Sequence, residues 1–142
     1  MRVPKDEKIS FRIKGELFVL DIHKEFTVDP DKLGVLPRNY AYFKELEART
    51  LERLRATELE KDRYYASQFL VIKEDGDKNR PPSDKWVNSE ILEDEEYLAL
   101  LEKSNQAYIN YKKVAGLVRS YQTFIDVSRT LVANAREEFK NS

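Results

Sequence analysis

The sequence predicts a mostly α-helical protein, arranged as a coiled-coil-like helical hairpin with a short N-terminal element. The 142 residues include only 4 glycines and 5 prolines, too few turn formers for a many-stranded sandwich or barrel. Charged residues make up 36% of the chain and hydrophobic residues 41%, which suits amphipathic helices and is too apolar for intrinsic disorder. The length is near that of one domain, so we expect a single domain spanning residues 1–142.

The N-terminal part, residues 1–38, is predicted to hold one short element and a connecting loop. Apolar residues near its start alternate as in a strand, and the same stretch also places apolar residues on one helical face. The alternating positions are Ile9, Phe11 and Ile13. We expect a short helix over Glu16–Lys24, with any strand confined to residues 8–20. Three residues that break regular structure then mark the loop: Pro30, Gly34 and Pro37.

Residues 39–70 are predicted to form the first long helix, because a stripe of residues recurs at steps of three and four. The stripe consists of Phe43, Leu46, Thr50, Leu54 and Thr57. A loop is expected over residues 71–88, where Gly76 and the Pro81-Pro82 pair interrupt the helical pattern. The loop would connect the two arms of the hairpin.

Residues 89–140 are predicted to form the second helical segment, which contains no proline. Its helix is expected to begin at about Ser89 or Asp94, with the acidic residues Glu93–Glu96 in its first turns. Carboxylates near a helix start are favoured by the helix dipole. Gly116 lies in the middle of this segment, at a cost near 1 kcal/mol relative to alanine. We therefore expect either a closely packed neighbouring helix or a break at this glycine.

The second segment carries two apolar stripes. The first has a repeat close to 3.5 residues, as in a coiled coil; it consists of Tyr97, Leu101, Ser104, Tyr108, Tyr111, Ala115, Val118, Gln122, Ile125 and Val132. The second consists of Leu100, Ala107, Val114, Leu117, Tyr121, Phe124 and Leu131. A helix that is apolar on two sides needs two neighbours, so the surplus face predicts a homo-oligomer. The expected subunit interface is Tyr111, Val114, Leu117, Val118, Tyr121, Phe124 and Ile125.

The chain lacks the residues that several classes of catalytic and metal-binding proteins require. There is no cysteine, so a disulfide framework, a thiolate nucleophile and a sulfur-ligated metal are excluded. His23 is the single histidine, and no glycine-rich phosphate loop is present. We expect a protein that is not an enzyme and has no catalytic residue, metal or cofactor. No apolar run approaches the roughly 20 residues of a membrane span and no signal peptide is visible, which predicts a cytoplasmic protein without a membrane partner.

Basic and aromatic residues alternate along both long helices. Proteins that bind single strands combine cations for phosphates with rings on which bases stack. The candidate nucleic-acid-binding residues are Arg55, Lys61, Arg63, Lys112, Lys113, Arg119 and Arg129. The chain as a whole has a net charge of −1, so such binding would depend on local patches. An ordinary charged helix face with tyrosines in the core remains the alternative.

The order of several motifs resembles the UvsY recombination mediators of T-even-like phages. The motifs are the DPDKL segment, the KDRYYAS segment and the closing Ser128-Arg129-Thr130. The resemblance covers about 110 residues, roughly from Leu20 onward. The matching positions are Asp29, Lys32, Leu33, Tyr64, Tyr65, Leu92, Asp94, Leu98, Tyr108, Ser128, Arg129 and Phe139.

The resemblance implies a non-enzymatic protein that forms a homo-oligomeric ring and binds single-stranded DNA. Its expected partners are a RecA-like recombinase and the single-strand-binding protein that covers the DNA onto which the recombinase is loaded. By the same resemblance, Lys61 and Arg63 would contribute to DNA binding, and a phage-encoded protein would act in the host cytoplasm. The alternative is a structural coiled-coil adaptor or assembly protein that does not bind DNA.

Overall fold

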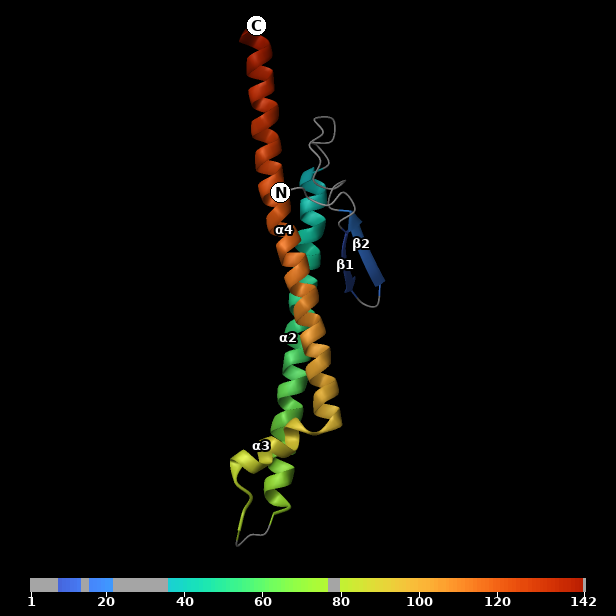
Figure 1. Ribbon diagram of the computed structural model, residues 1–142, viewed down its shortest axis with the longest axis vertical. Helices are drawn as coiled ribbons and strands as arrows, with labels where there is room; N and C mark the ends of the chain where they lie inside the picture. The colour runs from blue at the N-terminus through green and yellow to red at the C-terminus, as the bar shows by residue number, and fades with distance from the viewer. Residues whose placement is uncertain (1–7, 14–15, 22–35, 77–79, 142) are drawn as a thin grey trace. The chain divides into compact units, whose positions relative to one another are not determined.

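The computed structural model describes residues 8–13, 16–21, 36–76 and 80–141. The described elements are β1 (Lys8–Ile13), β2 (Glu16–Asp21), α2 (Leu36–Glu74), α3 (Asp84–Leu92) and α4 (Glu95–Asn141) (Figure 1). Helices account for most of these residues, which confirms the predicted mostly α-helical class.

The contacts within the chain define two compact units, to which α2 and α4 both contribute. Unit 1 comprises Met1–Thr50 and Asn110–Ser142, and unit 2 comprises Leu51–Ile109. Each unit is described by itself below.

Unit 1 begins with an antiparallel hairpin of β1 and β2, in which Lys8 pairs with Asp21 and Ile13 pairs with Glu16. The short helix expected over Glu16–Lys24 is therefore wrong for Glu16–Asp21; residues 22–24 lie outside the described residues. An isolated two-stranded hairpin is marginal in water and needs a surface to pack against. In unit 1, Ile9 and Leu20, which are directly paired, pack against the helical core.

Side chains of α4 also hold the hairpin. Asn110 Nδ2 donates a hydrogen bond to the Arg12 carbonyl at 3.0 Å, and Lys113 Nζ donates one to the Ser10 carbonyl at 3.0 Å. Both acceptors are backbone groups of β1, which lies beside α4 in this unit (Figure 1). These contacts favour the strand pattern over the helical pattern that the same residues also fit.

The core of unit 1 lies between the beginning of α2 and the middle of α4. Its buried members are Phe43, Leu46, Val114, Leu117, Val118 and Tyr121. The rings of Phe43 and Tyr121 stack with their centroids 5.1 Å apart. Helix α4 continues without a break through Gly116, and a Cβ atom at that position would meet nothing within 4 Å among the described residues. The expectation of a break at Gly116 is therefore wrong, and the described residues place no closely packed neighbour against this glycine.

Unit 2 contains α3, which falls partly within the predicted loop over residues 71–88. The helix begins at Asp84 because the side chain of Ser83 accepts a hydrogen bond from the Trp86 amide, as expected of an N-cap. Lys73 Nζ bridges the turn, donating to the Pro82 carbonyl at 2.6 Å and pairing with Asp84 Oδ1 at 2.7 Å. Gly76 is required at this turn, since a Cβ atom there would collide with the Pro82 ring.

The core of unit 2 forms around α3. Val87 and Ile91 are fully buried and Tyr97 is nearly so. Half-buried side chains pack against them: Tyr64, Tyr65, Phe69, Ile72 and Leu101. The chain leaves the helical conformation at Glu93 and Asp94, which separates α3 from α4. Of the two expected starts of the second long helix, Ser89 and Asp94, the structure agrees with the later one, since α4 begins at Glu95.

Candidate nucleic-acid interface

The part of α4 that belongs to unit 1 is the most basic helical segment of that unit. Between residues 110 and 133 it carries four basic side chains and one carboxylate, Asp126. The basic residues are Lys112, Lys113, Arg119 and Arg129, and all four are exposed. A polyanion that approached this stretch would meet a local charge of +3.

The four basic side chains differ in whether they already contact other residues of the chain. Lys113 donates to the Ser10 carbonyl, and Lys112 also has a partner in the chain. Among the residues that the structure describes, Arg119 and Arg129 do not lie within ion-pair distance of a carboxylate. The two arginines are therefore available to an external anion without breaking an ion pair in the described part of the chain.

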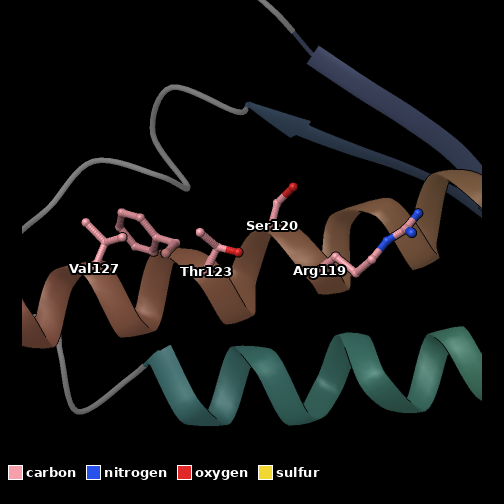
Figure 2. Close-up of a pocket in the computed structure, with 5 residues that line it drawn as sticks. Arg119, Ser120, Thr123 and Val127 are labelled. Atoms are coloured by element: carbon pink, nitrogen blue, oxygen red, sulfur yellow. The ribbon is translucent and has the colours of Figure 1, made fainter.

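An open hollow lies on α4 beside one of these arginines. It has a volume of about 480 Å³ and is lined by Arg119, Ser120, Thr123, Phe124 and Val127. Figure 2 shows Ser120, Thr123 and Val127 on the side of α4 that is turned away from α2. This side is therefore distinct from the buried side that carries Val118, Tyr121 and Ile125.

The hollow joins a cation, two hydroxyl groups and an aromatic ring. Ser120 Oγ donates to the Gly116 carbonyl at 3.0 Å, which leaves its oxygen able to accept a hydrogen bond. Thr123 makes no hydrogen bond through its hydroxyl within the described residues, so that group can donate to a ligand. The Phe124 ring is half-buried and Val127 is 48% exposed.

Sequence reasoning selected Arg119 as a DNA contact but placed Phe124 in a subunit interface and missed Ser120, Thr123 and Val127. A helical projection could have found them, because positions 120, 123, 124 and 127 recur at helical spacing along one flank of the core stripe. They were missed because hydroxyl residues at such positions are common on exposed helix faces.

The other predicted DNA contacts, Arg55, Lys61 and Arg63, lie on α2 in unit 2. Arg55 and Arg63 are exposed, whereas the Lys61 side chain is only 22% exposed and lies 4.0 Å from an oxygen of Asp62. Glu60, a further acidic neighbour, is paired with Lys103 at 3.2 Å. These three cations are thus set among carboxylates, and the structure assigns them to a different unit from Lys112, Lys113, Arg119 and Arg129.

The net charge of the chain is close to zero, but the two units carry net charges of opposite sign. Unit 1 holds 16 lysines and arginines against 12 aspartates and glutamates, a net charge of +4. Unit 2 holds 9 against 14, a net charge of −5. Dividing the sequence into two consecutive halves hides this difference, because unit 1 joins the N-terminal and C-terminal parts of the chain.

The predicted subunit interface is largely buried within the chain itself. Val114, Leu117, Val118 and Tyr121 belong to the core of unit 1, and Ile125 is 8% exposed. Tyr111 and Phe124 are half-buried. The side chains that leave most apolar surface open at the end of α4 are others: Val127, Leu131 and Phe139. The homo-oligomer itself stays a prediction, but the core residues have little surface left for a second chain.

Tyr64 and Tyr65 of α2 lie in unit 2, where both are half-buried and hydrogen-bonded. Their rings are therefore not exposed surfaces on which bases could stack. Tyr64 donates to Asp94 Oδ2 at 2.6 Å, and Tyr65 donates to Asn88 Oδ1 at 2.6 Å. The bond to Asp94 raises the pKa of Tyr64 above its usual range and lowers the pKa of the Asp94 carboxyl. Asp94 Oδ1 also accepts from the Glu96 amide at 2.9 Å, so one carboxylate caps α4 and binds α2.

The described residues lack the features of two other kinds of site. In the described ranges, aspartates and glutamates do not gather into groups of three or more that could hold a metal ion. Nor is any helix of the described part both long enough and apolar enough to cross a bilayer. His23 lies outside the described residues.

Comparison of the chain with protein-family models, with curated proteins and with solved structures gives no match.

Proposed function

We propose that the protein is a single-stranded-DNA-binding recombination mediator that helps to load a RecA-like recombinase onto strands covered by single-strand-binding protein. The observation that carries the DNA-binding part is the +4 charge of unit 1, with its exposed Arg119 and Arg129 on α4. The recombinase-loading part is supported by the sequence resemblance alone.

The proposed mechanism depends on repetition of a modest positive surface. Each subunit offers a few phosphate contacts, and a homo-oligomeric ring would present them many times to one strand. Linked contacts raise the effective concentration of the second and later ones, so the assembly binds more tightly than any subunit does. DNA held in this way would lose contacts with its covering protein, and the recombinase could then nucleate on the exposed strand.

Titration of a fluorescent oligo-dT at two salt concentrations, combined with light scattering, tests the proposal. A mediator should form a defined oligomer whose DNA affinity falls steeply as salt rises, because phosphate binding releases counterions. The loading step is tested separately by the lag before recombinase activity on DNA covered by single-strand-binding protein, which the mediator should shorten. Absence of DNA binding in the micromolar range would refute the proposal.

The second candidate, a structural coiled-coil adaptor, is favoured by the placement of the tyrosines. Tyr97 and Tyr121 are buried, and Tyr64 and Tyr65 are half-buried and hydrogen-bonded to side chains of their own unit. An adaptor predicts no DNA signal in the titration and no effect on recombinase loading. The same two measurements therefore separate the two functions.

A further inference from the structure

We propose that the outer edge of β2, at Leu17 and Val19, is a docking surface for the same strand of a second copy of the chain, so that two β1–β2 hairpins join in one antiparallel sheet. This inference rests on the homo-oligomer that the proposed function requires, and it names the surface through which two copies meet. It does not depend on DNA binding. It moves the contact from side chains of α4 that are buried in the core of unit 1 to an exposed strand of the same unit.

The pairing of the hairpin determines which backbone groups of β2 face outward. In an antiparallel pair, opposite residues alternate between those that bond to each other and those whose N–H and C=O groups point away from the partner strand. The carbonyls of Ser10 and Arg12 accept hydrogen bonds from side chains of α4, so these two residues of β1 point away from β2. Their partners in the ladder are Val19 and Leu17, whose backbone groups therefore point to the opposite edge of the sheet.

The two edges of the hairpin differ in whether they already have a partner. The β1 edge is occupied, since Asn110 and Lys113 of α4 donate to its carbonyls. Within the part of the chain that the structure describes, β2 pairs with β1 alone, and Leu17 and Val19 form no hydrogen bond outside that ladder. A strand edge with free N–H and C=O groups is a template for a further strand. The backbone of this edge therefore favours an extended segment over a helix as its occupant.

β2 also lacks the features that usually protect an open strand edge. Proteins block such edges with lysine, proline or a β-bulge. Residues 17–20 of β2 read Leu-Phe-Val-Leu, and the ladder with β1 runs without a bulge. Leu17 is 55% exposed and Val19 is 52% exposed. Exposed apolar side chains thus lie at the same two positions as the outward backbone groups.

β2 is self-complementary, which favours a second copy of the chain as the occupant of its edge. In antiparallel pairing about a two-fold axis, Leu17 of each copy lies opposite Val19 of the other, so the same contact forms twice. Opposite residues share a face of the sheet, so the four apolar side chains form one cluster. A shift of two residues would place Leu17 opposite Asp21, or Val19 beyond the first residue of the strand. The pairing is short and buries less than about 1,200 Å², so the two copies should associate with micromolar affinity.

Analytical ultracentrifugation of the full-length protein across the micromolar range tests the contact. The variants are Leu17→Lys and Val19→Lys, which place a cation on the edge of β2. Leu70→Lys and Val71→Lys are the matched controls, since they make the same changes at positions of α2 that are 61% and 46% exposed. Each β2 substitution occurs twice in a two-fold contact, so it should weaken self-association at least about fivefold. Both controls should associate like the original protein.

Disulfide cross-linking keeps the contact testable if a lysine variant weakens the hairpin itself. The chain has no cysteine, so Leu17→Cys and Val19→Cys each introduce a single thiol. In the proposed register, position 17 of one copy and position 19 of the other have Cα atoms about 5.5 Å apart, whereas two copies of the same position are about 7–8 Å apart. A disulfide spans the first separation and not the second. Mild oxidation with oxidised glutathione should therefore link the two variants to each other in a mixture, as measured by mass spectrometry, and should link few copies of either variant alone.

The outcomes separate this surface from the proposed function. Self-association that neither β2 lysine variant weakens beyond its control, or cross-links that form equally in the mixture and in each variant alone, would overturn the β2 contact. Binding of oligo-dT by a defined oligomer would in that case leave the proposed function standing. A protein that stays monomeric but binds a synthetic peptide with the sequence of β2 would assign the edge to a strand of another protein and would also overturn the contact. If the original protein is monomeric and does not bind oligo-dT, both proposals fail.

Discussion

At the scale of single residues, Asp94 joins two helices of unit 2 through one carboxylate. Its two oxygens accept from the Glu96 amide and from the Tyr64 hydroxyl, so it caps α4 and joins that helix to α2. The sequence places Asp94 in an acidic run that is typical of a helix start, but the partner on α2 lies thirty positions away. That contact depends on the folded arrangement of unit 2 and has no local signature.

The Tyr64–Asp94 bond predicts a pH dependence of stability. Because the pKa of Asp94 is lowered in the folded protein, its contribution is present above about pH 4 and is lost as the pH falls through the folded value. Because the pKa of Tyr64 is raised, its contribution is present below about pH 10 and is lost as the pH rises through the folded value. The contribution of this bond to stability should therefore be constant between these limits and should be lost on both sides.

Thermal unfolding of Tyr64→Phe between pH 3 and pH 8 tests this dependence. We expect a lower Tm at neutral pH and a shallower fall below pH 4, since the bond to Tyr64 is the main cause of the lowered Asp94 pKa. Tyr65→Phe is the control: its hydroxyl donates to the neutral Asn88, so the Tm should fall without a change in the pH profile. A Tyr64→Phe profile that runs parallel to the original one would contradict the assignment.

At the scale of elements, helical periodicity was enough to locate the long helices. The short elements depend instead on packing against the core and on a single helix cap. α2 covers Leu36–Glu74 around the predicted range 39–70. The hairpin residues fit a strand and a helix equally, and their packing against the core of unit 1 selects the strand. α3 is short and begins at a single N-cap serine, a signal that the neighbouring prolines obscured.

Gly116→Ala is expected to stabilise the protein. The residue lies within a continuous helix, where alanine is favoured over glycine by about 0.5–1 kcal/mol, and the new Cβ would meet no atom within 4 Å among the described residues. Urea unfolding followed by circular dichroism should show a higher midpoint with an unchanged slope. A lower midpoint, or a loss of oligomer mass, would instead indicate that the backbone of a second chain passes over Gly116.

At the scale of the whole molecule, the two units carry opposite net charges, +4 and −5, within a chain that is almost neutral. This separation indicates where a polyanion would bind, and it favours the cations of α4 in unit 1 over those of α2 in unit 2. The buried stripe of α4 serves the core of unit 1, so any subunit contact has to use other apolar side chains.

Two substitutions on α4 distinguish core from subunit contact. Tyr121→Ala, at a fully buried position, should lower the free energy of unfolding by about 3–5 kcal/mol, as is typical of large aromatic residues in cores. Leu131→Ser, at a position that is 50% exposed, should change it by about 0.5 kcal/mol or less and should lower the oligomer mass if this surface joins subunits. Light scattering and urea unfolding measure the two effects. A Tyr121→Ala protein that keeps its stability but loses mass would restore the interface predicted from the sequence.

The sequence by itself determined the helical class, the two long helices and the interruption between them, because composition and periodicity act along the chain. The absence of cysteine and the single histidine likewise excluded whole classes of chemistry without a structure. Only the tertiary structure decided that residues 8–13 and 16–21 pair as strands, which apolar stripe of α4 is buried, and that the charges separate into a basic and an acidic unit. The physical reason is that each of these depends on contacts between segments far apart in the chain, whose energies do not appear in any local pattern.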